Sequence, residues 1–386
     1  MGLAHENGLR AIYQVAAIQG VGGFPTDYPP LALMILGVVA RAGAAVGRTD
    51  FFALKISLLL TTLGCAWLMG ILEERRPLLG AIAMFAALFV DSMLLVYLDV
   101  YVVFVFLLAL ICLKRGLLAT GTALYTASIF VKWQPIILAP FILLYLFREP
   151  PRQTFAAGIS TILPSAALLA VIYLLFGNAV FAAFWRGITD PSFSGSALNL
   201  NWLMTAAVQL KTGELARDGG VVHSVLIGGG YRTIGYVSYA LRLITFFTTI
   251  AYFYYSKRQF ADLLRASLVG FLCYFMFGSG VHENHEIMAA VLALCLAATT
   301  GVGKVQAAVL AVIANINLVV FFGLNGARTH FSRLLFGWDF TIYLALLNLL
   351  IFAVLWVPVA IPVWRHLAGT WRSPLRSRSF EETAAR

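Results

Sequence analysis

The chain has 386 residues, of which 61% are hydrophobic, 13% aromatic and only 11% charged. A soluble globular domain carries roughly 25% charged residues, so 27 basic and 17 acidic side chains are too few to cover a soluble protein of this length. The composition therefore predicts an all-α polytopic membrane protein. It excludes a soluble two-domain enzyme, a disulfide-rich secreted module and a disordered protein.

The net charge of +10 does not by itself indicate nucleic-acid binding. In membrane proteins a basic excess reflects cytoplasmic loops rich in Lys and Arg, so we expect no nucleic-acid partner. The cysteines have no CxxC spacing and each lies inside an apolar run, which argues against a disulfide framework or a zinc site. They are Cys65, Cys112, Cys273 and Cys295.

Apolar runs long enough to cross about 30 Å of hydrocarbon need about 20 residues, or fewer where a helix is broken or shielded by its neighbours. The chain contains about eleven such runs, which predict a transmembrane helical bundle forming one integral-membrane domain over residues 1–364. The runs are 51–72, 78–97, 99–113, 116–131, 134–147, 154–176, 233–255, 264–281, 286–301, 305–323 and 341–363.

A further apolar run, residues 31–47, is preceded by Pro29 and Pro30 and contains Arg41 within a stretch rich in Gly and Ala. The distribution of charges permits this run either to cross the membrane or to lie along its surface. The prolines and the arginine favour an interfacial helix.

Lys and Arg are concentrated in short loops between the predicted spans and in the basic tail, residues 365–386. The positive-inside rule places these segments in the cytoplasm. The longer loop at residues 177–232 then lies on the outer side of the membrane.

Within the stretch from 78 to 147, the predicted spans are interrupted by three charged residues, Asp91, Asp99 and Lys132. A charge near the middle of a membrane costs about 2.5–3.5 kcal/mol on insertion scales and is functional by default. The alternatives are structural carboxylates that are hydrogen-bonded or cap broken helices, and a lysine that extends to the membrane surface. With the orientation above, all three fall toward the outer half of the membrane.

Two further polar groups lie on the same side. Between two spans the chain has His282, Glu283 and His285, which suit phosphate or sugar recognition or a solvated loop. The histidines are three residues apart, whereas an HExxH zinc site needs four, so no metal site is expected. In the long loop, Asn199 and Trp202 suit either sugar binding or a belt of aromatic residues at the membrane surface.

Five short segments resemble, in this order along the chain, the GT-C superfamily of membrane glycosyltransferases. The nearest branch is the bacterial proteins similar to family 87 mannosyl- and arabinofuranosyltransferases, and the resemblance runs from about residue 27 to about residue 300. The segments are DYPPL (27–31), Asp91-Ser92 followed by Tyr97-Leu98-Asp99, KWQP (132–135), NLNWL (199–203) and HENH (282–285).

The resemblance implies transfer of a hexose or pentose from a polyprenyl-phosphate-sugar donor to a lipid or glycan acceptor. It implies a multi-pass protein of a bacterial plasma membrane with its site on the outer face, where membrane lipid admits the donor tail and no cofactor is needed. A carboxylate would act as general base on the acceptor hydroxyl. Asp91, Asp99, Lys132, Asn199, Trp202, His282, Glu283 and His285 would contact the substrates.

The family's usual catalytic carboxylate follows a first transmembrane helix that precedes the DYPPL segment. Here Glu6 is the only acid before Asp27. We expect that the first helix is missing from this sequence; otherwise Asp27 is itself the base, or the protein is inactive. Asp27 also suits a helix cap before Pro29. The alternative function is a membrane transporter or flippase, since broken helices with buried charges also form transport sites.

Overall fold

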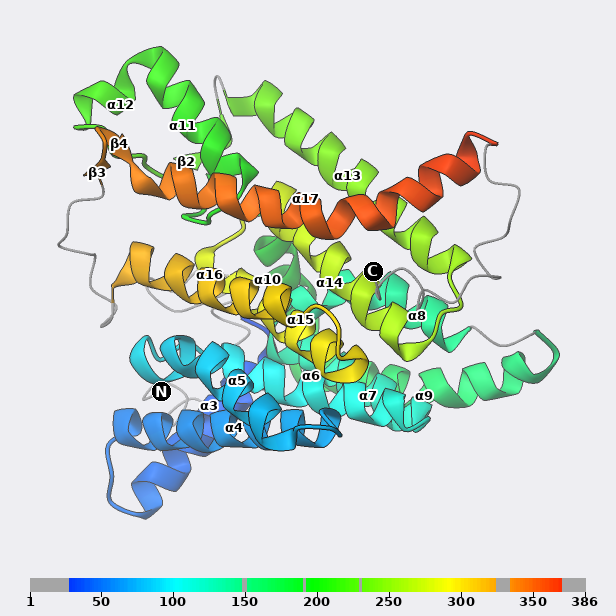
Figure 1. Ribbon diagram of the computed structural model, residues 1–386. Coiled ribbons are helices and arrows are strands. Elements are labelled where there is room, and N and C mark those ends of the chain that lie inside the picture. Colours follow the sequence, from blue (N-terminus) through cyan, green and yellow to red (C-terminus); the bar gives the residue numbers. More distant parts are fainter. Residues whose placement is uncertain (1–27, 148–150, 190–191, 229–230, 324–333, 370–386) are drawn as a thin grey trace. The chain divides into compact units, whose positions relative to one another are not determined.

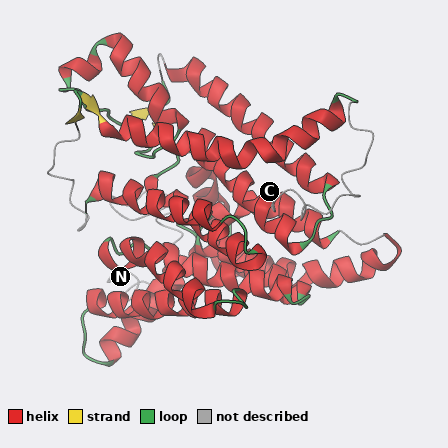
Figure 2. Cartoon of the chain, in the orientation of Figure 1, coloured by secondary structure: helices red, strands yellow, loops and turns green. Residues whose placement is uncertain are grey.

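The computed structural model describes residues 28–147, 151–189, 192–228, 231–323 and 334–369. Within these ranges the chain is mostly helical, with two short two-stranded sheets (Figure 1) (Figure 2). This confirms the predicted all-α class. The candidate base Asp27 and the tail beyond residue 369 lie outside the described residues.

Six helical segments in the described part of the chain are long and apolar enough to cross a membrane. A seventh is added if two helices that meet at a bend of 106°, Thr161–Phe176 and Ala179–Ile188, form one broken span. These helices support a membrane protein, but the predicted number of about eleven spans is not confirmed. The six segments are Asp50–Leu72, Pro77–Leu94, Tyr231–Tyr255, Phe260–Phe277, Lys304–Phe322 and Phe340–Leu367.

Several of the predicted spans form helices that are too short to cross alone. The helices α6 (Asp99–Lys114), α7 (Leu118–Val131) and α15 (Glu286–Thr300) have 16, 14 and 15 residues. At 1.5 Å per residue they are roughly 21–24 Å long, against about 30 Å of hydrocarbon. Their crossing of the membrane therefore stays a prediction.

Internal contacts divide the chain into two compact units. Unit 1 comprises Met1–Ile136 and Glu149–Asp190, and unit 2 comprises Ile137–Arg148 and Pro191–Arg386. The single domain predicted from the sequence thus contains two separately packed groups of helices.

Unit 1 is built around α6, whose side chains are buried along most of its length. Helices α4 and α7 pack against α6, and α5 and α9 pack against α4 and α7 respectively. The run predicted to be interfacial forms α3, which contacts α4 and α7. The remaining elements are α3 (Pro30–Ala45), α4 (Asp50–Leu72), α5 (Pro77–Phe89), α9 (Pro151–Phe176) and α10 (Ala179–Ile188).

The helix that starts as α5 breaks before α6 begins. It passes into a π-helical turn, η1 (Val90–Leu94), in which the Leu95 N–H donates to the Val90 carbonyl. Val96 then has a φ of 62°, which is unusual for a β-branched residue. Asp91 lies inside this turn and Asp99 begins the next helix, so both predicted acids are placed by the break.

Unit 2 has its core in α14 and α15, which are almost wholly buried. Helices α13 to α16 pack in succession, and α17 packs against α11, α13, α14 and α16. The helices are α8 (Ala139–Leu146), α11 (Leu200–Thr212), α12 (Glu214–Arg217), α13 (Tyr231–Tyr255), α14 (Phe260–Phe277), η3 (Glu283–His285), α15, α16 (Lys304–Phe322) and α17 (Phe340–Leu367); η2 (Gln134–Leu138) leads into α8.

Two antiparallel pairs of short strands complete unit 2. In the first, Ser192 pairs with Leu226 and Ser194 with Val225; in the second, Leu334 pairs with Asp339 and Leu335 with Trp338. The strands are β1 (Ser192–Ser194), β2 (Val225–Leu226), β3 (Leu334–Leu335) and β4 (Trp338–Asp339).

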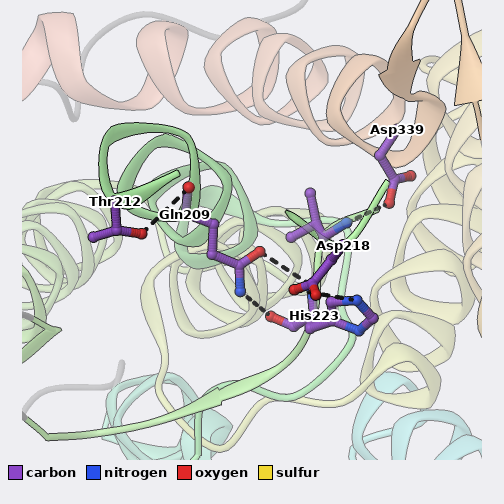
Figure 3. A network of polar contacts seen from close by, with 6 residues as sticks. Gln209, Thr212, Asp218, His223 and Asp339 are labelled. Carbon is purple, nitrogen blue, oxygen red and sulfur yellow. Dashed lines mark hydrogen bonds and ion pairs between the residues drawn. The ribbon is translucent and has the colours of Figure 1, made fainter. Parts of the chain in front are cut away.

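Much of the long loop predicted at residues 177–232 is folded, and its part around Val222 is bonded to Asp339 at the start of α17 (Figure 3). The Gln209 side chain donates to the His223 carbonyl at 3.0 Å and accepts from the His223 N–H at 3.2 Å. The neighbouring Val222 N–H donates to the buried Asp339 carboxylate at 2.9 Å. Since Asp339 also caps α17, these bonds fix the loop to the start of that helix.

We expect Gly270→Ala to destabilise unit 2, because a Cβ atom on Gly270 would overlap the buried Phe141 ring, which also packs edge-on against Phe246. Overpacking of this kind costs about 1–3 kcal/mol. Thermal unfolding in detergent measures the loss. Gly228→Ala is the matched control, since a Cβ atom there meets open space. Additional Phe141→Leu should make room for the methyl group; equal melting of Gly270→Ala and the natural protein would contradict this packing.

Candidate functional site

The predicted site residues that the structure describes fall into two clusters, one in each unit. The cluster of unit 1 contains Asp91, Asp99 and Lys132, and that of unit 2 contains Asn199, Trp202, His282, Glu283 and His285.

In unit 1, Lys132 and Asp99 form an ion pair. Both residues are buried, with 8% and 6% of their surfaces exposed. Asp99 is the first residue of α6, and Lys132 follows the end of α7, where its backbone is extended. The break between α7 and η2 thus brings a lysine to the start of α6.

Asp91 and Tyr28 are close enough to Lys132 to act on it electrostatically. Asp91 is wholly buried, and the next residue, Ser92, is hydrogen-bonded to Thr62 of α4 at 2.9 Å. The structure therefore brings together the three charged residues that the sequence singled out in this unit.

The sequence interpretation gave no role to Lys55, which lies in the apolar helix α4. Its ammonium group donates to the carbonyl of Met93 in the π-helical turn and lies 5.7 Å from the centre of the Phe51 ring. The sequence feature that could have identified Lys55 is its position as a charged residue within an apolar span. The broken segment from Asp91 to Asp99 is therefore contacted by two lysines, one within α4 and one directly after α7.

In unit 2, the HENH segment forms the short helix η3 and the residue before it. The Nδ1 atom of His282 lies 3.1 Å from the Gly195 carbonyl oxygen. A carbonyl only accepts, so Nδ1 of His282 carries the proton. In His285, by contrast, Nδ1 carries no proton, because it accepts from the His282 backbone N–H at 3.4 Å. The same atom lies 3.2 Å from the Tyr274 hydroxyl.

Gly195 is packed closely against this segment. It forms an isolated parallel bridge with His282, and a Cβ atom on Gly195 would lie 2.6 Å from the Val281 carbonyl oxygen and 2.9 Å from His282 Nδ1. A second bond, from the Gly280 N–H to the Ser192 carbonyl at 2.7 Å, lies nearby. The long loop thus holds the backbone that carries the two histidines.

Asn199 and Trp202 are buried, each with 1% of its surface exposed. Asn199 caps α11 by accepting from the Trp202 N–H at 3.0 Å, and its amide donates to the Phe275 carbonyl at 3.0 Å. The Trp202 indole N–H donates to the Thr341 hydroxyl at 2.7 Å. These contacts tie α11 to α14 and α17, and sugar binding by the two residues stays a prediction.

Glu283 is also buried. Its carbonyl and the carboxylate of Glu286 are held by amides from α16 and α17, Asn317 and Asn348, which the sequence interpretation did not consider. The sequence feature that could have identified Asn317 and Asn348 is the presence of an amide side chain within an apolar helix.

In the described part of the chain, no three His, Cys, Asp or Glu side chains are grouped so that they could hold a metal ion. Neither known family models nor curated protein sequences match this chain. Its function is therefore inferred from the residues and their geometry.

We expect Asp99→Asn to cost about 3–5 kcal/mol of stability, because it leaves the Lys132 ammonium buried beside a neutral group. Thermal unfolding in detergent measures the change. Adding Lys132→Gln should restore most of the loss, since two neutral amides can then hydrogen-bond to each other.

The control is an exposed ion pair of the same unit, in which Lys114 lies 2.8 Å from Glu74. This contact lowers the pKa of the Glu74 carboxyl, yet water hydrates the group when the pair is broken. Glu74→Gln should leave the melting temperature nearly unchanged. If Asp99→Asn melts like Glu74→Gln, the ion pair between Asp99 and Lys132 is wrong.

Proposed function

We propose that the protein is a membrane glycosyltransferase. It transfers a hexose or pentose from a polyprenyl-phosphate-sugar donor to a lipid or glycan acceptor at the outer face of a bacterial plasma membrane. The observation that carries the proposal is the charged break in unit 1, where Asp91, Asp99 and Lys132 meet in an apolar bundle. Buried charges in membrane helices mark functional sites. The order of the five segments that resemble GT-C enzymes favours this function over others.

The donor's phosphate requires positive charge, because it is the leaving group and is already anionic. Lys132 is a buried ammonium held by a carboxylate, and a phosphate can replace Asp99 as its partner or share it. The displaced Asp99 carboxylate can then accept a hydrogen bond from a sugar hydroxyl. An ammonium positioned in this way stabilises the charge that develops on the phosphate oxygen.

The histidines of unit 2 support the proposal separately. An imidazolium is a good partner for phosphate, and His282 is oriented by the Gly195 carbonyl. The adjacent Glu283 is a buried acid in the same segment, which suits a hydrogen bond to a sugar hydroxyl.

In the proposed reaction a carboxylate takes the proton of the acceptor hydroxyl as its oxygen bonds to the anomeric carbon. The bond from that carbon to the phosphate oxygen breaks, and polyprenyl phosphate leaves with the bonding electrons. Asp27 is the candidate base. The next residue, Tyr28, lies within electrostatic reach of Lys132, which supports a role for this part of the chain in the site.

A transporter or flippase is the second candidate. The observations that favour it are the broken helix at Val90–Leu94 and the bend of 106° after Phe176, since interrupted helices form many transport sites. Bond formation separates the two candidates.

The test is sugar transfer by purified protein in liposomes given radiolabelled polyprenyl-phosphate sugar and a bacterial lipid extract. We expect label on a new lipid or glycan. The pair of substitutions Asp99→Asn and Lys132→Gln removes one charge of each sign, so the net charge of the site is unchanged, and it should lower the rate about a hundredfold. Asp27→Asn should do the same if Asp27 is the base. Glu74→Gln is the control and should retain full activity.

Label that crosses the bilayer while remaining on polyprenyl phosphate would favour a transporter. Label that neither crosses nor moves to an acceptor, with every donor tested, would contradict both candidates.

A further inference from the structure

A carboxylate is buried where three helices and the long loop of unit 2 meet. Glu286, the first residue of α15, is wholly inaccessible, as are Asn317 of α16 and Asn348 of α17. Both amides donate to the Glu286 carboxylate, at 2.9 Å from Asn317 and 2.6 Å from Asn348. We call these three side chains, with the Leu198 backbone and the Glu283 carbonyl that they hold, the Glu286 cluster.

The backbone fixes which way each amide faces. The Asn317 side-chain oxygen accepts from the Leu198 N–H at 3.3 Å, so its NH₂ group faces the Glu283 carbonyl, at 3.2 Å, and Glu286. The Asn348 NH₂ group donates to the Leu198 carbonyl at 2.9 Å and to Glu286. Neither amide can turn over without losing a bond to the backbone.

The number of hydrogens fits an ionised Glu286. The two NH₂ groups supply four N–H hydrogens, and these meet two backbone carbonyls and the two carboxylate oxygens. A proton on either oxygen would need a further acceptor, whereas both oxygens already accept from an amide N–H. The position of Glu286 at the start of α15 also favours a negative charge. Neutral amides and a helix end therefore stabilise this buried charge.

The cluster connects the two parts of unit 2 that carry predicted site residues. Leu198 directly precedes Asn199, which caps α11, and Glu283 lies within the HENH segment. His282 is bonded on one side to Gly195, three residues before Leu198. On the other side it is followed by Glu283, whose carbonyl belongs to the cluster. Moving Glu286 or Asn317 would shift both attachments of His282.

We propose that Glu286 is a positioning residue, whose ionised carboxylate aligns the two asparagines so that Leu198 and Glu283 hold the His282 imidazole against Gly195. The proposal rests on the proposed function for its effect on sugar transfer. Glu286 is fully enclosed and does not itself touch substrate. It acts through His282, an imidazole that suits contact with an anionic substrate group.

The experiment moves the carboxylate from one side chain to its neighbour. In Glu286→Gln, the new NH₂ group faces an N–H donor whose orientation is fixed by Leu198. In Asn317→Asp, two carboxylates face each other. In the double variant, the glutamine NH₂ at position 286 donates to the new carboxylate at 317, which still accepts from the Leu198 N–H. Net charge matches the natural protein, and only the Glu283 carbonyl loses its donor.

Two readouts are needed. The first is the rate at which diethyl pyrocarbonate modifies His282 in the folded, monodisperse fraction, mapped by mass spectrometry. His223, whose side chain is 56% exposed, is the internal reference. The second is the rate of sugar transfer. Each single variant should change the His282 rate several-fold relative to His223 and lower turnover about ten- to a hundredfold, because displacing a catalytic contact by 1 Å can have such an effect.

The double variant should return both readouts most of the way to those of the natural protein. Glu74→Gln, an exposed acid in unit 1, should change neither. If the single variants melt at lower temperature but their folded fractions show normal His282 reactivity and turnover, Glu286 is only structural and the proposal is wrong. A double variant no better than the singles would also overturn it.

The two proposals fail in different ways. If the natural protein transfers no sugar but His282 reactivity follows the expected pattern, the positioning role stands and the proposed function fails. If the protein transfers sugar and His282 reactivity is the same in all variants, the positioning role fails and the proposed function stands.

Discussion

Polar groups inside an apolar helical bundle must be satisfied by the chain itself, because neither lipid nor packed apolar side chains can hydrate them. Both clusters of predicted site residues follow from this constraint. In unit 1, a buried lysine and a buried aspartate compensate each other. In unit 2, the Glu286 charge is met by the dipoles of two asparagines. Each solution holds together elements that are distant in sequence, and each places candidate site residues.

The ion pair in unit 1 and the Glu286 cluster in unit 2 suit different roles. An ion pair has partners that a ligand can exchange, since a phosphate can replace the Asp99 carboxylate beside Lys132. The Glu286 cluster has no such partner to release, because every amide hydrogen is bonded and both amide orientations are fixed by Leu198. We therefore assign substrate contact to the charged break and alignment to the Glu286 cluster.

The sequence predicted the features that depend on local pattern. Apolar runs predicted the long helices, and the charges of Asp91, Asp99 and Lys132 predicted interrupted ones. It did not predict the π-helical turn, since its i to i−5 bonds have no clear residue signature. Nor did it predict the pairing of Asp99 with Lys132, because only the fold brings residues this far apart together.

The long loop shows a second limit of prediction. Asn199 and Trp202 have the composition of a sugar-binding surface, but the structure uses their polar groups to cap α11 and to bond Thr341. An amide beside an aromatic residue suits either role, and only the fold shows which bonds these two residues make within the protein. Asn317 and Asn348 illustrate the reverse case, since polar residues in apolar helices were visible while their shared partner, Glu286, depended on the packing of three helices.

The most direct test of the central claim is the structure of the protein in a lipid nanodisc with a polyprenyl-phosphonate sugar that cannot be transferred. We expect a phosphonate oxygen at about 2.7–2.9 Å from the Lys132 ammonium, with Asp99 either released from Lys132 or sharing it with the phosphonate. An analogue bound elsewhere while Lys132 and Asp99 remain paired with each other would contradict it.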